Sequence, residues 1–92
     1  SNLVLLAPYQ LMKNHEISKK VESLILEVLN IETLPINAST ENIDEWDSLA
    51  YLSIVSKLEK KFKLKIYQEN INKFNSIKNI VKEIELCKKI KP

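Results

Sequence analysis

The stretch "DEWDSLAYLSIV", residues 44–55, joins a polar loop to a helical pattern and decides the fold. Asp47 stands where a helix N-cap is expected, because its carboxylate can accept a hydrogen bond from a free N–H of the first turn. Apolar residues then recur at the three- and four-residue spacing of one buried helical face. The pattern predicts a helix from Ser48 to about Phe62. Its core face is expected to comprise Tyr51, Ile54, Val55, Leu58 and Phe62.

Two further segments have the same helical period. The first helix is expected from about Glu16 to Leu29, and Ser76 is expected to cap the last helix. A short third helix is predicted over Gln68–Lys73. The apolar faces comprise Ile17, Val21, Leu24, Ile25 and Val28 in the first helix, and Ile77, Ile80, Val81 and Ile84 in the last. Because no segment keeps the alternation of a strand, we predict an all-α, four-helix domain.

The first two helices are separated by a long loop, "NIETLPINASTENIDEW", residues 30–46. Pro35 and a high content of Asn, Ser and Thr favour irregular structure there. Loops of this length tend to be functional in compact domains. The residues expected to fix the loop to the core are Ile31, Leu34, Ile36, Ile43 and Trp46. Leu64 and Ile66 are expected to form a buried connector after the second helix.

The composition is that of one small globular domain. The chain has 92 residues, of which 45% are hydrophobic and 28% charged, and it has no apolar run long enough to span a bilayer. Cys87 is its one cysteine, so no internal disulfide can form, which fits a reducing, cytoplasmic compartment.

The first residues of the chain differ from the rest. "SNLVLLAPYQL" lacks the basic start of a signal peptide, and Met12 opens a polar, helix-like segment. We therefore expect residues 1–11 to be derived from the expression vector or disordered, and residues 12–92 to form the domain.

Charge is distributed unevenly along the chain. Residues 1–50 hold three lysines and eight acidic residues, whereas residues 51–92 hold eleven lysines and four acidic residues. A basic half can indicate nucleic-acid binding. However, the lysines are spread over several predicted helices, and the chain has no arginine and no aromatic cluster on which bases could stack. A solvated helical surface without a nucleic-acid partner is therefore the preferred interpretation.

Ser48 is the candidate for chemistry, and its position has three interpretations. A serine nucleophile needs a nearby base, but His15 is the only histidine and lies near the start of the first helix. An Asp-Ser cap pair would explain Ser48 alone, but Leu49 and Leu52 lie roughly 100–160° away from the core face and form a candidate docking surface. The third interpretation makes Ser48 an attachment point, because a helix N-terminus favours a phosphate and a separate enzyme would supply the activation. The sequence predicts neither a catalytic residue nor a metal site.

The stretch "WDSLAYLSIVSKLEKKFKLKI", residues 46–66, resembles the central motif of acyl and peptidyl carrier proteins. The resemblance extends over roughly residues 13–90 and implies an acyl-carrier-like bundle. It implies that a phosphopantetheinyl transferase moves the 4′-phosphopantetheine arm of coenzyme A onto Ser48. Asp47 would then help the transferase to position its magnesium ion, and Leu49 would enter an apolar pocket on that enzyme. Leu52 and Glu59 match partner-recognition positions.

The resemblance also implies that the domain catalyses nothing and carries an acyl or aminoacyl group as a thioester. Carriers of fatty acid synthesis usually have a strongly acidic second helix, but here Ala50, Ser53, Lys60 and Lys61 stand where acids are common. A glycine commonly precedes the D-S-L motif in these carriers, and here none does. We therefore expect a monomeric carrier of a specialised pathway, served by its own acyl- or aminoacyl-loading and transfer enzymes. The alternatives are a helical interaction module without an arm and a small basic nucleic-acid-binding domain.

Overall fold

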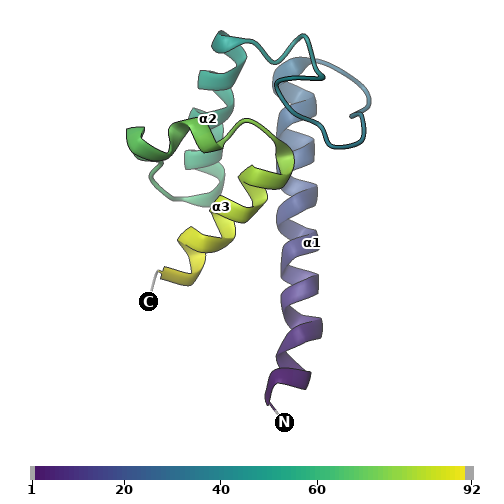
Figure 1. Cartoon of the computed structure of the whole chain (residues 1–92), viewed down its shortest axis with the longest axis vertical. Helices are drawn as coiled ribbons and strands as arrows, with labels where there is room; N and C mark the ends of the chain where they lie inside the picture. Colours follow the sequence, from purple (N-terminus) through teal and green to yellow (C-terminus); the bar gives the residue numbers. More distant parts are fainter. Residues whose placement is uncertain (1, 91–92) are drawn as a thin grey trace.

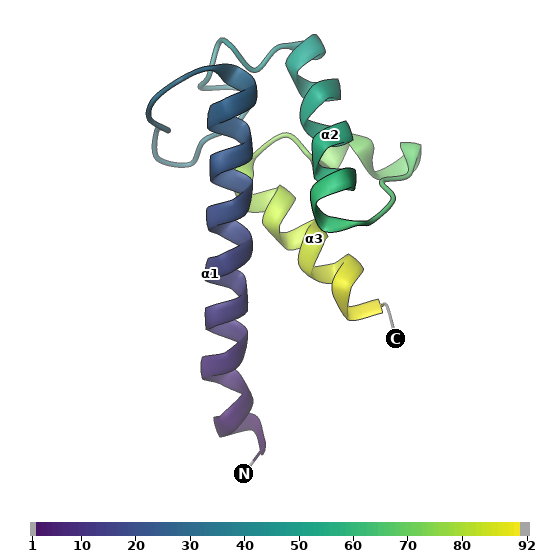
Figure 2. The same ribbon diagram turned by 180° about the vertical axis from the view of Figure 1, so that it is seen from behind.

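The computed structural model describes the backbone of residues 2–90 and the side chains of residues 15–87. Its elements are the helices α1 (Asn2–Leu29), α2 (Ser48–Phe62) and α3 (Ile77–Ile90), with a 3₁₀ helix, η1 (Gln68–Lys73), before α3. Both α2 and α3 pack beside the C-terminal half of α1, while the N-terminal part of α1 extends past them (Figures 1 and 2). The all-α class, the four-helix order and the long loop after the first helix are confirmed.

The first helix begins at Asn2, well before the expected start near Glu16, and that predicted boundary is wrong. The prediction used the apolar residues that repeat toward the core, and the first of these is Ile17. A helix propagates beyond its packed face because each added residue gains one backbone hydrogen bond. Residues 2–11 form part of α1 in the structure. Their origin outside the native domain stays a prediction.

The core lies where α1, α2 and α3 meet. Its fully buried side chains come from all three helices, and full burial of an aliphatic side chain contributes about 1.5–3 kcal/mol to stability. The side chains with no exposed surface are Val21, Ile25, Ile54, Leu58, Ile80 and Ile84. The core faces predicted from the helical period are therefore confirmed, with Val28, Tyr51, Ile77 and Val81 half-buried at their margins.

Helix α2 is defined by local signals at both ends. Asp47 is extended and its Oδ1 accepts a hydrogen bond from the N–H of Ala50 at 2.9 Å, as expected for the N-cap. At the other end Lys63 takes the left-handed conformation, with φ of 54°, and its N–H donates to the carbonyl of Glu59. Glycine normally occupies this position, and the chain has none. The connector that follows is half-buried at Leu64 and Ile66.

The long loop contacts the core through Ile43 and Trp46, which are buried, and through Ile31 and Leu34, which are half-buried. Ile36 was expected to do the same, but it is 88% exposed, so that prediction is wrong. Its place against the core is taken by Ala38, which is 5% exposed.

Backbone hydrogen bonds join this loop to the start of α3. The N–H of Ile77 donates to the carbonyl of Ala38 at 3.1 Å, and the N–H of Thr40 donates to the carbonyl of Asn75 at 2.9 Å. One isolated antiparallel bridge pairs Ser39 with Ser76, and no strand forms in residues 2–90. Ser76 Oγ also accepts from the N–H of Asn79 at 3.1 Å, which confirms Ser76 as the cap of α3. In the described part of the chain, no helix is both long and apolar enough to cross a bilayer.

Candidate functional site

Ser48 is the first residue of α2, and its side chain is exposed. The N-cap bond of Asp47 and the bond from the N–H of Tyr51 to the carbonyl of Asp47, at 2.8 Å, fix the first turn around it. The free N–H groups and the positive end of the helix dipole make this a favourable position for a phosphate. The structure therefore places the hydroxyl at a surface position suited to phosphoryl attachment.

No base that could activate Ser48 belongs to this site. Among side chains 15–87, none forms a hydrogen bond with the Ser48 hydroxyl. His15 lies exposed on α1 and is not brought to the start of α2. Over the same residues, no cluster of three His, Cys, Asp or Glu side chains could hold a metal. The described side chains therefore give Ser48 no hydrogen-bonded base of the kind that activates a serine nucleophile.

Two leucines lie exposed next to Ser48. Leu49 is 81% exposed and Leu52 is 57% exposed, whereas Ile54 and Leu58 on the same helix have no exposed surface. The prediction that these leucines lie off the core face is confirmed. Adjacent exposed apolar side chains are a typical feature of interaction surfaces.

A shallow groove of about 660 Å³ lies beside Ser48, between α2 and η1. Its apolar lining comes from Trp46, Tyr51, Leu52 and Ile71. The Tyr51 hydroxyl donates a hydrogen bond to the carbonyl of Ile71 and so joins α2 to η1. Burial raises the pKa of Tyr51 above its ordinary value of 10.0, which keeps the hydroxyl protonated and able to donate. The groove offers an apolar wall along which a group attached to Ser48 can lie.

Sequence reasoning did not find the bond between α2 and η1. The sequence feature that could have indicated this bond is Tyr51 on the core face of α2, because a buried phenol usually finds a hydrogen-bond partner. Trp46, at the same groove, is 3% exposed, and its Nε1–H has no acceptor among residues 15–87. Leaving a buried donor without a partner costs about 1–3 kcal/mol.

Glu59, expected to recognise partners, is engaged within the chain. Its Oε2 accepts a hydrogen bond from the N–H of Ile66 at 2.8 Å, and the side chain is half-buried. It stands eleven positions after Ser48 on α2, which is about 16 Å along the helix axis at 1.5 Å per residue. The structure therefore brings Asp47, Leu49 and Leu52 together with Ser48 but leaves Glu59 at the far end of α2.

The comparison with known families agrees with this geometry. A family model described as "Phosphopantetheine attachment site" matches residues 19–84, from within α1 to within α3. The chain belongs to this family of phosphopantetheine-binding carrier proteins. The carrier is also 29% identical over 76 residues to an acyl carrier protein of Akkermansia muciniphila, and the match covers 80% of this chain and 95% of the relative.

The carrier's cofactor is 4′-phosphopantetheine, a covalent group. An exposed hydroxyl at a helix N-terminus, next to an apolar groove, fits the phosphate and the arm of that group. Domains of this family carry acyl groups for other enzymes and are themselves typically without catalytic activity. Their partners are phosphopantetheinyl transferases and acyl-handling enzymes.

Proposed function

We propose that Ser48 is the residue that receives the arm, and that the arm holds an acyl or aminoacyl group as a thioester. The observation that carries the proposal is an exposed hydroxyl at the first position of α2 with no base in reach. In the transfer, the Ser48 oxygen bonds to the phosphorus of the pantetheine phosphate and the pyrophosphate bond of coenzyme A breaks. Adenosine 3′,5′-bisphosphate leaves, and a base of the transferase takes the serine proton.

The residues around Ser48 have distinct roles in this proposal. Asp47 keeps the first turn in place through Oδ1 and helps the transferase to position its magnesium ion. Leu49 enters an apolar pocket of the transferase, and its high exposure means that no rearrangement is needed. Leu52, one turn further along α2, contacts the enzymes that load or unload the arm.

The domain itself then acts by tethering. A flexible arm raises the effective concentration of its thioester at each partner enzyme. This work needs no catalytic side chain, and we propose that the domain has no enzymatic activity of its own. A monomer in a reducing, cytoplasmic compartment, as expected from the sequence, stays a prediction.

The charge on α2 supports a specialised pathway over housekeeping fatty acid synthesis. Lys57, Lys60 and Lys61 are exposed on the C-terminal half of the helix, and Glu59 there is bonded to the connector. Complementary charge steers docking and excludes wrong partners. Partners with a neutral or acidic surface fit this half of α2 better than partners with a basic patch. We propose a short specialised acyl group or an aminoacyl group as the cargo.

Intact-mass analysis tests the attachment. Wild-type protein incubated with coenzyme A, magnesium and a broad-specificity transferase should gain the mass of one phosphopantetheinyl group, and Ser48→Ala should gain none. An unmodified wild type would support the alternative of a helical interaction module without an arm. Nucleic-acid binding that falls steeply with added salt would instead support the basic binding domain.

A further inference from the structure

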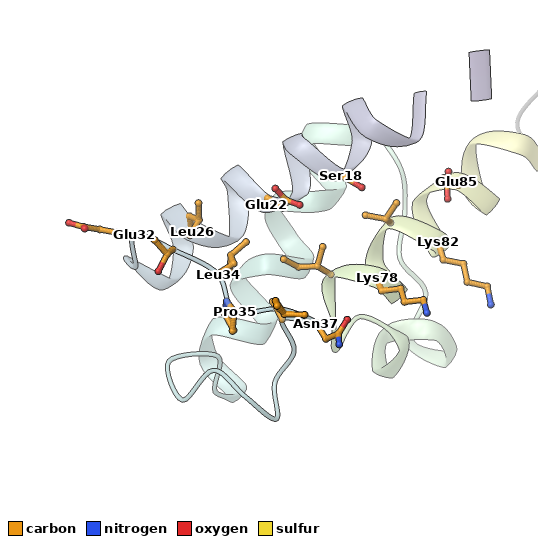
Figure 3. Close-up of a pocket in the computed structure, with 15 residues that line it drawn as sticks. Ser18, Glu22, Leu26, Glu32, Leu34, Pro35, Asn37, Lys78, Lys82 and Glu85 are labelled. Carbon is orange, nitrogen blue, oxygen red and sulfur yellow. The ribbon is translucent and has the colours of Figure 1, made fainter. Parts of the chain in front are cut away.

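A second groove, of about 900 Å³, lies between α1, the loop before α2, and α3 (Figure 3). It shares no lining residue with the groove beside Ser48. Half-buried apolar side chains contribute to its lining from all three elements: Leu26 from α1, Leu34 from the loop, and Ile77 and Val81 from α3. The groove therefore presents an apolar floor on a part of the surface that carrying the arm does not use.

Ile36 lines this groove and is 88% exposed, more than either leucine beside Ser48. The loop holds it there through Asn42, whose Nδ2 donates to the carbonyls of Ile36 at 3.3 Å and Asn37 at 3.1 Å. Asn42 Oδ1 also accepts from the N–H of Ser39 at 2.9 Å. These hydrogen bonds hold the turn in place and keep a large apolar side chain exposed beside the groove. Both are features of a preorganised docking site.

The two long edges of the groove carry opposite charge. Glu22 of α1 and Glu32 of the loop lie along one edge, and Lys78 and Lys82 of α3 lie along the other (Figure 3). Glu85, further along α3, is the one acid on the lysine edge. Among side chains 15–87, the four edge residues form no ion pair across the groove. Their charges are therefore open to an incoming partner.

We propose that this groove docks an amphipathic helix of a partner protein, with basic residues on one side of its apolar stripe and acidic residues on the other. The stripe would cover Ile36 and the groove floor, in the manner of helices that bind in grooves. The basic side would lie along Glu22 and Glu32, and the acidic side along Lys78 and Lys82. The proposal does not rest on the arm, because Ser48 lies outside the groove.

A second copy of this chain fits the groove less well. The exposed face of α2, which contains Leu49 and Leu52, continues into Lys57, Lys60 and Lys61. That face is basic and lacks the acidic side that would meet Lys78 and Lys82. Charge complementarity therefore favours a foreign helix with both signs of charge over α2 of a second copy.

Three synthetic helical peptides with the same leucine stripe test the proposal. One has lysines on one side of the stripe and glutamates on the other, one has lysines on both sides, and one has glutamates on both sides. An edge-swapped peptide would not discriminate, because a helix can lie in a groove in either direction. Each uniform peptide meets one edge of the groove that has its own sign of charge, and it forgoes two surface ion pairs there. The mixed peptide should therefore bind about tenfold more tightly than either uniform peptide in fluorescence anisotropy.

Variants of the full chain locate the binding. Ile36→Ser should weaken binding of the mixed peptide about tenfold, because the site loses its most exposed apolar side chain. Leu49→Ser, at a similarly exposed position, should leave binding unchanged. Lys78→Glu/Lys82→Glu should transfer the preference to the peptide with lysines on both sides. Both lysines are exposed, and a glutamate at position 78 would lie in the first turn of α3, where it favours the helix dipole, so this variant should keep its fold.

Equal affinity for the three peptides, or absence of binding to the mixed one, would overturn the proposal. So would equal weakening by Leu49→Ser and Ile36→Ser. Self-association in sedimentation that Ile36→Ser abolishes would assign the groove to a second copy and also overturn it. Arm transfer to Ser48, measured by mass, should be unaffected in Ile36→Ser and in Lys78→Glu/Lys82→Glu, which separates this proposal from the proposed function.

Discussion

The carboxylate of Asp47 is expected to have two roles, one as the N-cap of α2 and one in positioning the magnesium ion of the transferase. Substitutions at Asp47 can separate these two roles. Its Oδ1 accepts from the N–H of Ala50 at 2.9 Å. Asp47→Ala removes this cap and should lower the free energy of unfolding by about 1 kcal/mol. Asp47→Asn keeps an acceptor in the same place and loses only the interaction of the charge with the helix dipole, which contributes about 0.3–1 kcal/mol at the surface.

The two substitutions should have different effects on stability and the same effect on arm transfer. Urea unfolding measures the first, and the rate of mass gain with coenzyme A and a transferase measures the second. If Asp47 helps to position magnesium, both variants transfer slowly, although Asp47→Asn is nearly as stable as the wild type. Transfer to Asp47→Asn at the wild-type rate would refute the metal-positioning role and leave Asp47 as a helix cap alone.

Three further predictions follow from the same structure. Leu49→Ala should change the free energy of unfolding by less than about 0.5 kcal/mol yet slow arm transfer, whereas Leu58→Ala should cost about 2–5 kcal/mol in urea unfolding; equal costs would contradict the assigned faces. Tyr51→Phe removes the hydrogen bond to the carbonyl of Ile71 and should lower the free energy of unfolding by about 1 kcal/mol. Because the folded-state pKa of Tyr51 is raised, wild-type stability should also fall relative to Tyr51→Phe as pH rises above 10.0, and parallel pH profiles would count against the buried phenol. Lys60→Glu/Lys61→Glu should improve acyl transfer by fatty acid synthase enzymes, with a gain that shrinks in added salt; a wild type that already matches an acidic carrier would rule out the charge argument.

The parts of the fold that the sequence predicted are those fixed by neighbours in the chain. The start of α2 depends on Asp47 and an N–H three residues later, and its buried face depends on the helical period. The range of η1, Gln68–Lys73, was also predicted, and it follows directly after the connector that contains Leu64 and Ile66. The site residues Asp47, Leu49 and Leu52 follow from the same local pattern, since their positions around Ser48 are set by the helix itself.

The parts that sequence reasoning missed depend on contacts between distant residues. Ile36 is apolar, but the amide of Asn42, six positions later, holds its turn away from the core. Glu59 was expected at a partner-recognition position, and its hydrogen bond from the N–H of Ile66, seven positions later, was not predicted. The bond from Tyr51 to Ile71 spans twenty positions. A helical period contains no information on such pairs, because they form only after the elements have packed.

Attachment of the arm at Ser48 is the central claim, and fragment mapping of the modified protein tests it most directly. Ser53 and Ser56 lie on the same helix, and Ser56 is as plainly exposed as Ser48. Mass spectrometry of the peptide that contains α2 should place one phosphopantetheinyl group on Ser48, with full modification retained in Ser56→Ala and lost in Ser48→Ala. A group mapped to Ser53 or Ser56, or a Ser48→Ala variant that still gains the arm, would contradict the account.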